Sequence, residues 1–153
     1  MKKKLFDANY LRGGAWHRRE FPINCLDTDL LIAILRGKKE AFSKVLALDE
    51  DSKGASTTAI NAFEIFFGAY KSKMQSDNLR ETERLIDRLN VIPLDFSSSK
   101  RAAEISANLS TIGEPIDYRD AMIAAIALEN DLTLLTRNKS RFARIKNLKL
   151  ETW

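Results

Sequence analysis

Apolar and polar positions follow two repeating patterns along the chain. Short apolar runs with the length of buried strands lie at about 23–27, 54–56, 91–94, 132–136 and 148–150. Stretches in which apolar residues recur every three or four positions predict helices at about 30–36, 39–51, 58–71, 76–90, 97–111 and 118–130, with a helical turn at 142–145. Because strands alternate with helices throughout, the sequence predicts one α/β domain with a mostly parallel sheet.

Several element ends can be predicted from single residues. Asp29 is expected to be the N-cap of the first helix, and Gly37 to end it. Thr57 or Thr58 is expected to cap the third helix. Pro93 lacks a backbone N–H, so the strand at 91–94 is expected near an edge of the sheet.

Three carboxylates lie where the pattern predicts burial. Asp27 sits at the corner between the first strand and its helix, Glu64 lies in a phenylalanine-rich helix, and Asp120 opens an almost wholly apolar helix. Buried carboxylates require cations or hydrogen-bond donors. Each has a structural alternative: backbone donors for the first, an arginine for the second, and a role in the first helical turn for the third, with Asp117 as N-cap. Together they favour an all-oxygen site for Mg²⁺ or Mn²⁺.

Composition and charge narrow the class of protein. Residues 1–22 hold six basic and two acidic side chains, so residues 23–153 are neutral overall although the net charge is +4. Global basicity is therefore no argument for nucleic-acid binding, and a local patch is needed. Residues 1–22 show no periodicity and are expected to form an extension outside the core. No apolar run approaches the ~20 residues of a membrane span, and the single cysteine, Cys25, is expected to be buried in a cytoplasmic protein.

A polar and basic segment follows the strand at 132–136. Thr136 and Asn138 carry oxygens that could orient a ligand or a metal-bound water at the carboxyl end of that strand. Arg137, Lys139 and Arg141 provide local positive charge for phosphate groups. An ordinary solvated turn is the alternative interpretation.

Four segments, in this order, resemble a PIN domain, and more narrowly a VapC-type toxin of a toxin–antitoxin pair. They are Leu26-Asp27-Thr28-Asp29-Leu30-Leu31-Ile32, Thr58 to Gly68 with its central Glu64, Asp120-Ala121-Met122-Ile123-Ala124-Ala125, and Leu134-Leu135-Thr136-Arg137-Asn138 through Phe142. The resemblance covers about residues 23–153. It implies a three-layer α/β/α sandwich, a homodimer and an antitoxin partner.

The resemblance also implies metal-dependent cleavage of tRNA or another structured RNA. The catalytic and metal-binding acids of the family fall on Asp27, Glu64 and Asp120, with Mg²⁺ as the ion and Mn²⁺ as a possible substitute. On this mechanism Thr28, Thr136 and Asn138 would orient water or phosphate, and Arg137, Lys139 and Arg141 would contact the RNA backbone. Asp117, one helical turn before Asp120, could partly compensate for a missing fourth acid. The fourth acidic position of the family is not an Asp here: Asn138 stands in that region and Arg141 follows it, which puts a second metal ion in doubt.

Two alternatives from other classes stay open at this point. Asp27 and Asp29 form an Asp-x-Asp pair, a pattern that a phosphatase uses as nucleophile and acid. A non-catalytic PIN-fold module that binds RNA or protein would account for the missing fourth acid. Release of RNA fragments, release of phosphate from a small ester, or neither would distinguish the three readings.

Overall fold

The computed structural model of the protein describes residues 24–50 and 54–153, so the extension predicted at 1–22 lies outside the described residues. Five parallel strands form one sheet in the order β3-β2-β1-β4-β5. The strands are β1 (Asn24–Leu26), β2 (Ser56–Thr58), β3 (Asn90–Ile92), β4 (Thr133–Leu135) and β5 (Lys149–Glu151). The first strand of the chain is thus the central strand of the sheet.

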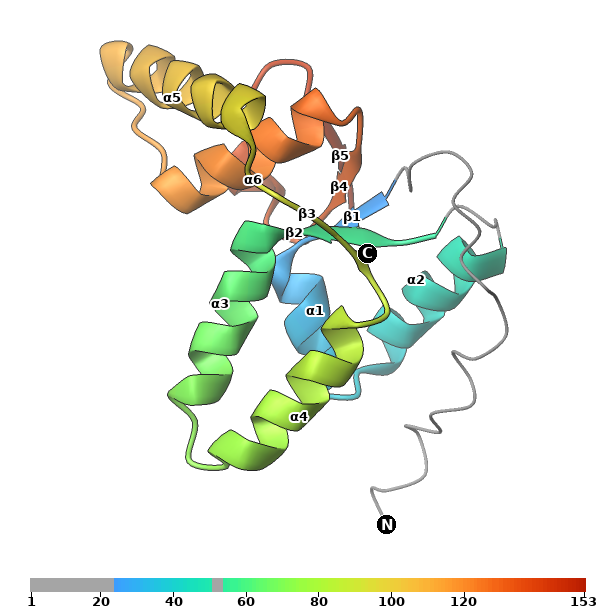
Figure 1. Cartoon of the computed structure of the whole chain (residues 1–153). Helices are drawn as coiled ribbons and strands as arrows, with labels where there is room; N and C mark the ends of the chain where they lie inside the picture. The colour runs from blue at the N-terminus through green and yellow to red at the C-terminus, as the bar shows by residue number, and fades with distance from the viewer. Residues whose placement is uncertain (1–23, 51–53) are drawn as a thin grey trace.

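Seven helices in the described ranges surround this sheet (Figure 1). They are α1 (Thr28–Leu35), α2 (Lys39–Glu50), α3 (Ala59–Tyr70), α4 (Gln75–Ile86), α5 (Phe96–Thr111), α6 (Tyr118–Glu129) and α7 (Lys139–Phe142). Helices α1 to α4 cover one face, and α5, α6 and α7 cover the other. The predicted three-layer α/β/α sandwich is confirmed.

The two faces have separate apolar cores because successive strand residues point to opposite sides. Cys25 and Leu134 pack with Ile123 and Phe142 on the α6 side, whereas the next residue of each strand, Leu26 or Leu135, packs on the α1 side. The predicted burial of Cys25 is confirmed. Burial raises the pKa of this thiol to about 12, so it stays protonated.

Some predicted ends are confirmed and others are wrong. Thr58 caps α3, where it accepts the amide of Asn61, and β3 is an edge strand that ends just before Pro93. Asp29 is not the N-cap of α1. The extended residue Asp27 has that position, and its carbonyl accepts the first amides of the helix, so α1 begins two residues earlier than expected.

Two short elements are displaced along the chain from their predicted places. The strand predicted at 54–56 lies at 56–58, because these residues pair with β1 and β3 and their side chains are buried despite being polar. The helical turn predicted at 142–145 lies at 139–142, one turn earlier. No helix in the described parts of the chain is long and apolar enough to cross a membrane.

Candidate active site

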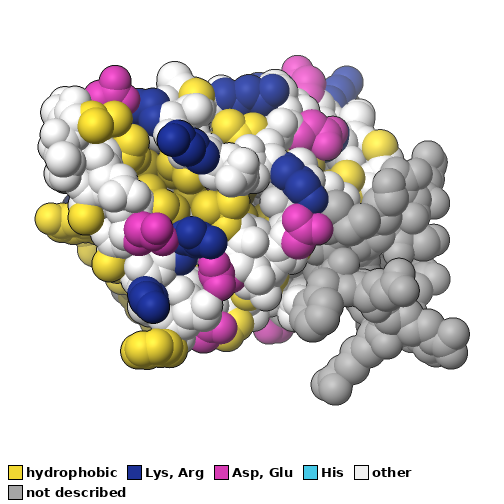
Figure 2. Space-filling view, turned by 90° about the horizontal axis from the view of Figure 1, so that it is seen from above, with side chains coloured by type: hydrophobic (Ala, Val, Ile, Leu, Met, Phe, Trp, Pro, Cys, Tyr) yellow, Lys and Arg dark blue, Asp and Glu magenta, His cyan; other side chains and the backbone are white. Residues whose placement is uncertain are grey.

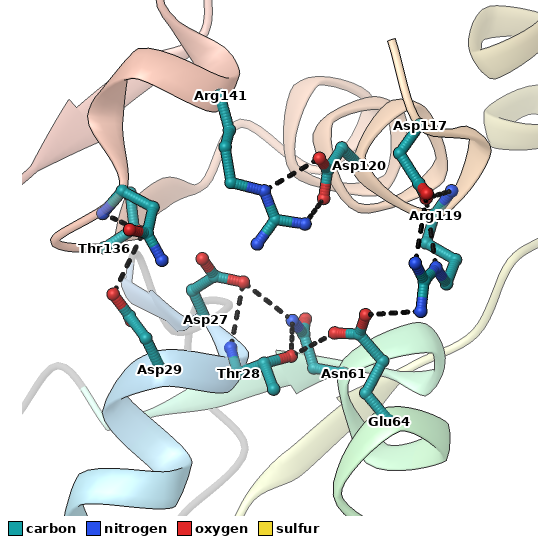
Figure 3. Close-up of polar contacts among 11 residues, drawn as sticks. Asp27, Thr28, Asp29, Asn61, Glu64, Asp117, Arg119, Asp120, Thr136 and Arg141 are labelled. Carbon is teal, nitrogen blue, oxygen red and sulfur yellow. Dashed lines mark hydrogen bonds and ion pairs between the residues drawn. The ribbon is translucent and has the colours of Figure 1, made fainter. Parts of the chain in front are cut away.

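Three neighbouring strands bring polar side chains to one edge of the sheet. Asp27 follows β1, Thr58 ends β2 and Thr136 follows β4, and these strands lie side by side in the order β2-β1-β4. The N-terminal turn of α6 adds Asp120 from the side (Figure 3). Because all strands are parallel, these groups meet at the carboxyl edge, where open α/β sheets bind ligands.

Asp27 is the most deeply buried acid of the site, with 1% of its surface exposed. Its Oδ1 accepts hydrogen bonds from the Thr28 amide at 2.8 Å and from the Asn61 side-chain amide at 2.9 Å. Its Oδ2 is buried and has no hydrogen-bond partner among the described residues. Burial raises the pKa of Asp27 to about 6, although the Thr136 hydroxyl and the Thr28 amide favour the ionised form.

Glu64 is joined to Asp27 through two intervening side chains. The Thr28 hydroxyl donates to Glu64 Oε2, and the Asn61 amide donates to that hydroxyl at 2.9 Å (Figure 3). The other oxygen, Oε1, lies 3.5 Å from Nη1 of Arg119. The side chain is only 14% exposed, as the apolar surroundings of Glu64 predicted. Its arginine partner comes from α6 and is half exposed.

Asp120 is buried against a guanidinium group. Arg141 donates through Nε to Oδ2 at 2.9 Å and through Nη2 to Oδ1, which is a two-bond, planar ion pair (Figure 3). Burial raises the pKa of Asp120 and outweighs the opposite effect of Arg141. Arg141 is predicted to contact RNA, but its guanidinium binds Asp120, which is a predicted metal ligand.

Asp117 is the N-cap of α6, which was the structural alternative for this residue. Its Oδ1 accepts the Arg119 backbone amide at 2.8 Å and Arg119 Nε at 3.0 Å, and its Oδ2 accepts Nη2 at 3.0 Å. The Arg119 side chain lowers the pKa of Asp117 to about 2. Arg119 thus connects the cap of α6 to Glu64 of α3.

Asp29 receives three donors from the C-terminal part of the chain. Its Oδ2 accepts the Arg137 amide at 2.7 Å and the Thr136 hydroxyl at 3.4 Å, and its Oδ1 accepts the indole N–H of Trp153 at 3.1 Å. The Asn138 amide donates to the Thr136 hydroxyl at 3.0 Å. Thr136 and the backbone of Asn138 are therefore held at the site through Asp29.

The three basic residues assigned to RNA differ in their surroundings. The Arg137 guanidinium lies 3.7 Å over the ring of Trp153, and its Nε donates to the Trp153 carbonyl. Arg141 is paired with Asp120, whereas Lys139 is exposed. Figure 2 shows one face of the molecule on which basic and acidic side chains are interspersed, in keeping with a neutral folded part.

Three residues of the site were not predicted from the sequence. Asn61, Arg119 and Trp153 contact Asp27, Glu64 and Asp29 respectively. Asn61 had a usable signal, since a polar residue in the first turn of an apolar helix is expected to be buried and bonded. Arg119 and Trp153 had no such signal, because they lie far from Glu64 and Asp29 along the chain and meet them only in the folded protein.

The oxygen atoms of the site suit a hard divalent cation. Two of its acids, Glu64 and Asp120, are paired with guanidinium groups. Among the described residues, no three acidic, histidine or cysteine side chains are grouped closely enough to hold an ion as they lie. The set consists of carboxylate and hydroxyl oxygens, which Mg²⁺ and Mn²⁺ prefer. The buried Oδ2 of Asp27 is a carboxylate oxygen to which no described residue donates a hydrogen bond. The residues present therefore fit such an ion.

Comparison with known proteins identifies the family of the chain independently of the site geometry. The family described as PIN domain matches residues 25–148. The tRNA(fMet)-specific endonuclease VapC of Salmonella typhimurium is 31% identical over 128 residues, which is 84% of this chain and 96% of that relative. The protein of the same name from Shigella flexneri is 29% identical over 128 residues, which is again 84% of this chain and 96% of that relative.

Solved structures agree with the sequence relatives. VapBC2 from Rickettsia felis, bound to a DNA fragment from its promoter, matches with a TM-score of 0.79 at 25% identity over 85% of this chain and 98% of that chain. DNA-bound VapBC from Salmonella typhimurium matches with a TM-score of 0.77 at 29% identity over 85% and 97%. The chain therefore belongs to the PIN-domain family, among its VapC-type ribonuclease toxins.

Proposed function

We propose that this endoribonuclease toxin hydrolyses phosphodiester bonds of RNA with Asp27, Glu64 and Asp120 as its catalytic acids and with Mg²⁺, or Mn²⁺ in its place, as cofactor. The observation that carries this assignment is that the Oδ2 of Asp27 is buried and receives no hydrogen bond from any residue in 24–50 or 54–153. Leaving such an oxygen unpaired costs about 1–3 kcal/mol or more. A fold that needed Asp27 only as a helix cap would use Oδ1 alone and would gain stability from an amide in the other position.

The roles of the chain's own groups follow from where they lie. A divalent cation held by the three acids would supply Lewis acidity and a water of lowered pKa. The Thr28 hydroxyl donates to Glu64, and the Thr136 hydroxyl lies beside the site, where it donates to Asp29. Both hydroxyls are therefore placed to orient water or phosphate. Asn138 and Asp117 lie at the rim as supporting residues.

The substrate class that we propose is tRNA. Two relatives of this chain are named for cleavage of tRNA(fMet). Lys139, Arg137 and Arg141 line the segment after β4 and are assigned to the RNA backbone. Phosphate contacts position an RNA without reading its sequence, so the choice among tRNAs rests on other contacts.

The partners that we propose are an antitoxin and a second copy of the chain, in the cytoplasm. The structural relatives are VapBC pairs. Four large apolar side chains on α3 and just after it are more than half exposed: Phe63, Phe67, Tyr70 and Met74. Exposed apolar surface of this kind is typical of a protein interface.

The phosphatase alternative is disfavoured by the surroundings of Asp29. That reaction needs the second acid of Asp-x-Asp to exchange a proton with the leaving group. Three donors, from Thr136, Arg137 and Trp153, already occupy the Asp29 carboxylate. The non-catalytic alternative keeps the fold and predicts no cleavage at all.

Sequencing of RNA 5′ ends after brief expression tests the proposed function. The wild type should produce a discrete set of new ends in tRNA, and Asp27→Asn should produce none. Asp77→Asn is the matched control, because Asp77 is an exposed partner of Arg80 on α4, and it should reproduce the wild-type ends. Identical 5′ ends from the wild type and Asp27→Asn would refute the nuclease assignment.

A further inference from the structure

Arg141 gives one of the three acids a permanent positive partner. Its guanidinium binds both oxygens of Asp120, and the carboxylate side chain is only 6% exposed. It also faces the buried Asp27 and the capping Asp117 closely enough to favour the ionised form of each carboxyl. A cation is thus already present among these acids, supplied by the chain itself.

The element that carries Arg141 holds it in this position. The next residue, Phe142, is fully buried in the core on the α6 side and anchors the short helix α7. The planar guanidinium matches the carboxylate with two parallel hydrogen bonds, which a lysine could not do. The pair is therefore a fixed part of the site.

Arg119 forms a looser contact with Glu64. It lies 3.5 Å from Glu64, against 3.0 Å for each of its two side-chain bonds to Asp117, and it is half exposed. Arg119 can leave Glu64 without losing its main partner. Glu64 then keeps only its bond from the Thr28 hydroxyl, and Oδ2 of Asp27 has no hydrogen-bond partner among the described residues. These two carboxylates are therefore available to a ligand, whereas Asp120 is not.

We propose that the Arg141 guanidinium takes the place of one metal ion in this site, so that the chain binds a single divalent cation through Asp27 and Glu64. Arg141 neutralises Asp120 and offers its remaining N–H groups to the RNA phosphate. This inference rests on the proposed function and narrows its metal ligands from three acids to two, because Arg141 holds both oxygens of Asp120.

The stoichiometry of Mn²⁺ binding tests the inference directly. Calorimetric titration of the full chain with MnCl₂, checked by the electron paramagnetic resonance of free Mn²⁺, should give one ion per wild-type chain. Arg141→Glu removes the resident cation and adds a carboxylate, so this variant should bind two. Arg101→Glu is the matched control: Arg101 also pairs with two carboxylates, Glu104 and Glu129, but at the far end of α6. It should bind one ion.

A milder variant covers the case in which Arg141→Glu does not fold. Arg141→Gln removes only the positive charge, and the single ion should then bind at least about tenfold more tightly, because charges this close interact strongly. Two ions on the wild type, or unchanged affinity in Arg141→Gln, would overturn the inference and leave the proposed function standing. A wild type that produces no new RNA ends would refute the proposed function whatever its stoichiometry.

Discussion

The side-chain amide of Asn61 donates to Oδ1 of Asp27 at 2.9 Å, on the side of the carboxylate opposite the free Oδ2. The same amide reaches the Thr28 hydroxyl, so one buried residue of α3 orients two groups that begin α1. Asn61 thereby fixes which oxygen of Asp27 is bonded and which is left open. The free energy of unfolding should reflect the burial of this unpaired oxygen.

Asp27→Asn should stabilise the protein at neutral pH. Burial raises the pKa of Asp27 from 3.8 to about 6, so the folded state keeps a proton that the unfolded state has lost. The wild-type free energy of unfolding should therefore fall as the pH rises from about 4 to about 6, by roughly 3 kcal/mol at one pKa unit per 1.36 kcal/mol. Urea unfolding at several pH values measures this. The variant should lack the fall and be more stable by about 1–3 kcal/mol at pH 7.5.

Neighbouring groups also affect the pKa of Asp27, and a distant acid serves as the control. Asp29 raises its pKa, and Arg141 and the Thr136 hydroxyl lower it. Asp77→Asn, on exposed α4, should leave the pH profile unchanged. A stability advantage of Asp27→Asn that persists at about pH 3 would contradict the titration argument, because Asp27 is largely protonated at that pH in both the folded and the unfolded wild type.

A divalent cation should stabilise the wild type in a pH-dependent manner. Millimolar Mn²⁺ should raise the melting temperature at pH 7.5, and a chelator should reverse the rise. The effect should shrink below about pH 6, where protons compete for Asp27. Differential scanning fluorimetry measures both, with Asp27→Asn as the control that shows little rise at either pH. An equal rise in wild type and variant would place the ion elsewhere.

Trp153→Ala should destabilise the fold by about 2 kcal/mol, through the loss of apolar packing and of the stack with Arg137. Trp153→Phe keeps a ring and removes only the indole N–H bond to Asp29, so it should cost about 1 kcal/mol. Urea unfolding gives both values. Equal losses in the two variants would mean that the stack contributes nothing.

Lys139→Ala should weaken RNA binding in proportion to one phosphate contact. Lys139 is exposed on α7, and its side chain forms no ion pair with another described residue. The slope of log affinity against log salt should become shallower by about 0.7–0.9. Filter binding of tRNA to a catalytically inactive background measures the slope. Lys100→Ala, exposed on α5, is the control with no expected change, and equal slopes for Lys139→Ala and wild type would exclude the contact.

Phe67→Ser should convert a dimer into a folded monomer. Phe63 and Phe67 stack with ring centroids 5.9 Å apart, and both are more than half exposed. Light scattering at tens of micromolar should show a dimer for the wild type and for the control Phe96→Ser, whose side chain is 87% exposed at the start of α5. A monomeric wild type would contradict the predicted homodimer.

The fold and the acids were predictable for different reasons. Periodicity and caps located every strand and helix to within a few residues, because these signals are local. Asp27 and Glu64 stood out as carboxylates in apolar surroundings. The partners of the acids could not be predicted, since Arg141 follows Asp120 by 21 positions and Arg119 meets Glu64 across two helices.

The central place of β1 in the sheet has a consequence for synthesis of the chain. Its neighbours are β2, about 30 residues later, and β4, more than 100 residues later. Until Thr133 to Leu135 have been synthesised, the edge of β1 that pairs with β4 has no partner. A growing chain therefore carries Asp27 and Glu64 without the sheet that aligns them with Asp120. The three acids therefore come together only after β4 has been synthesised.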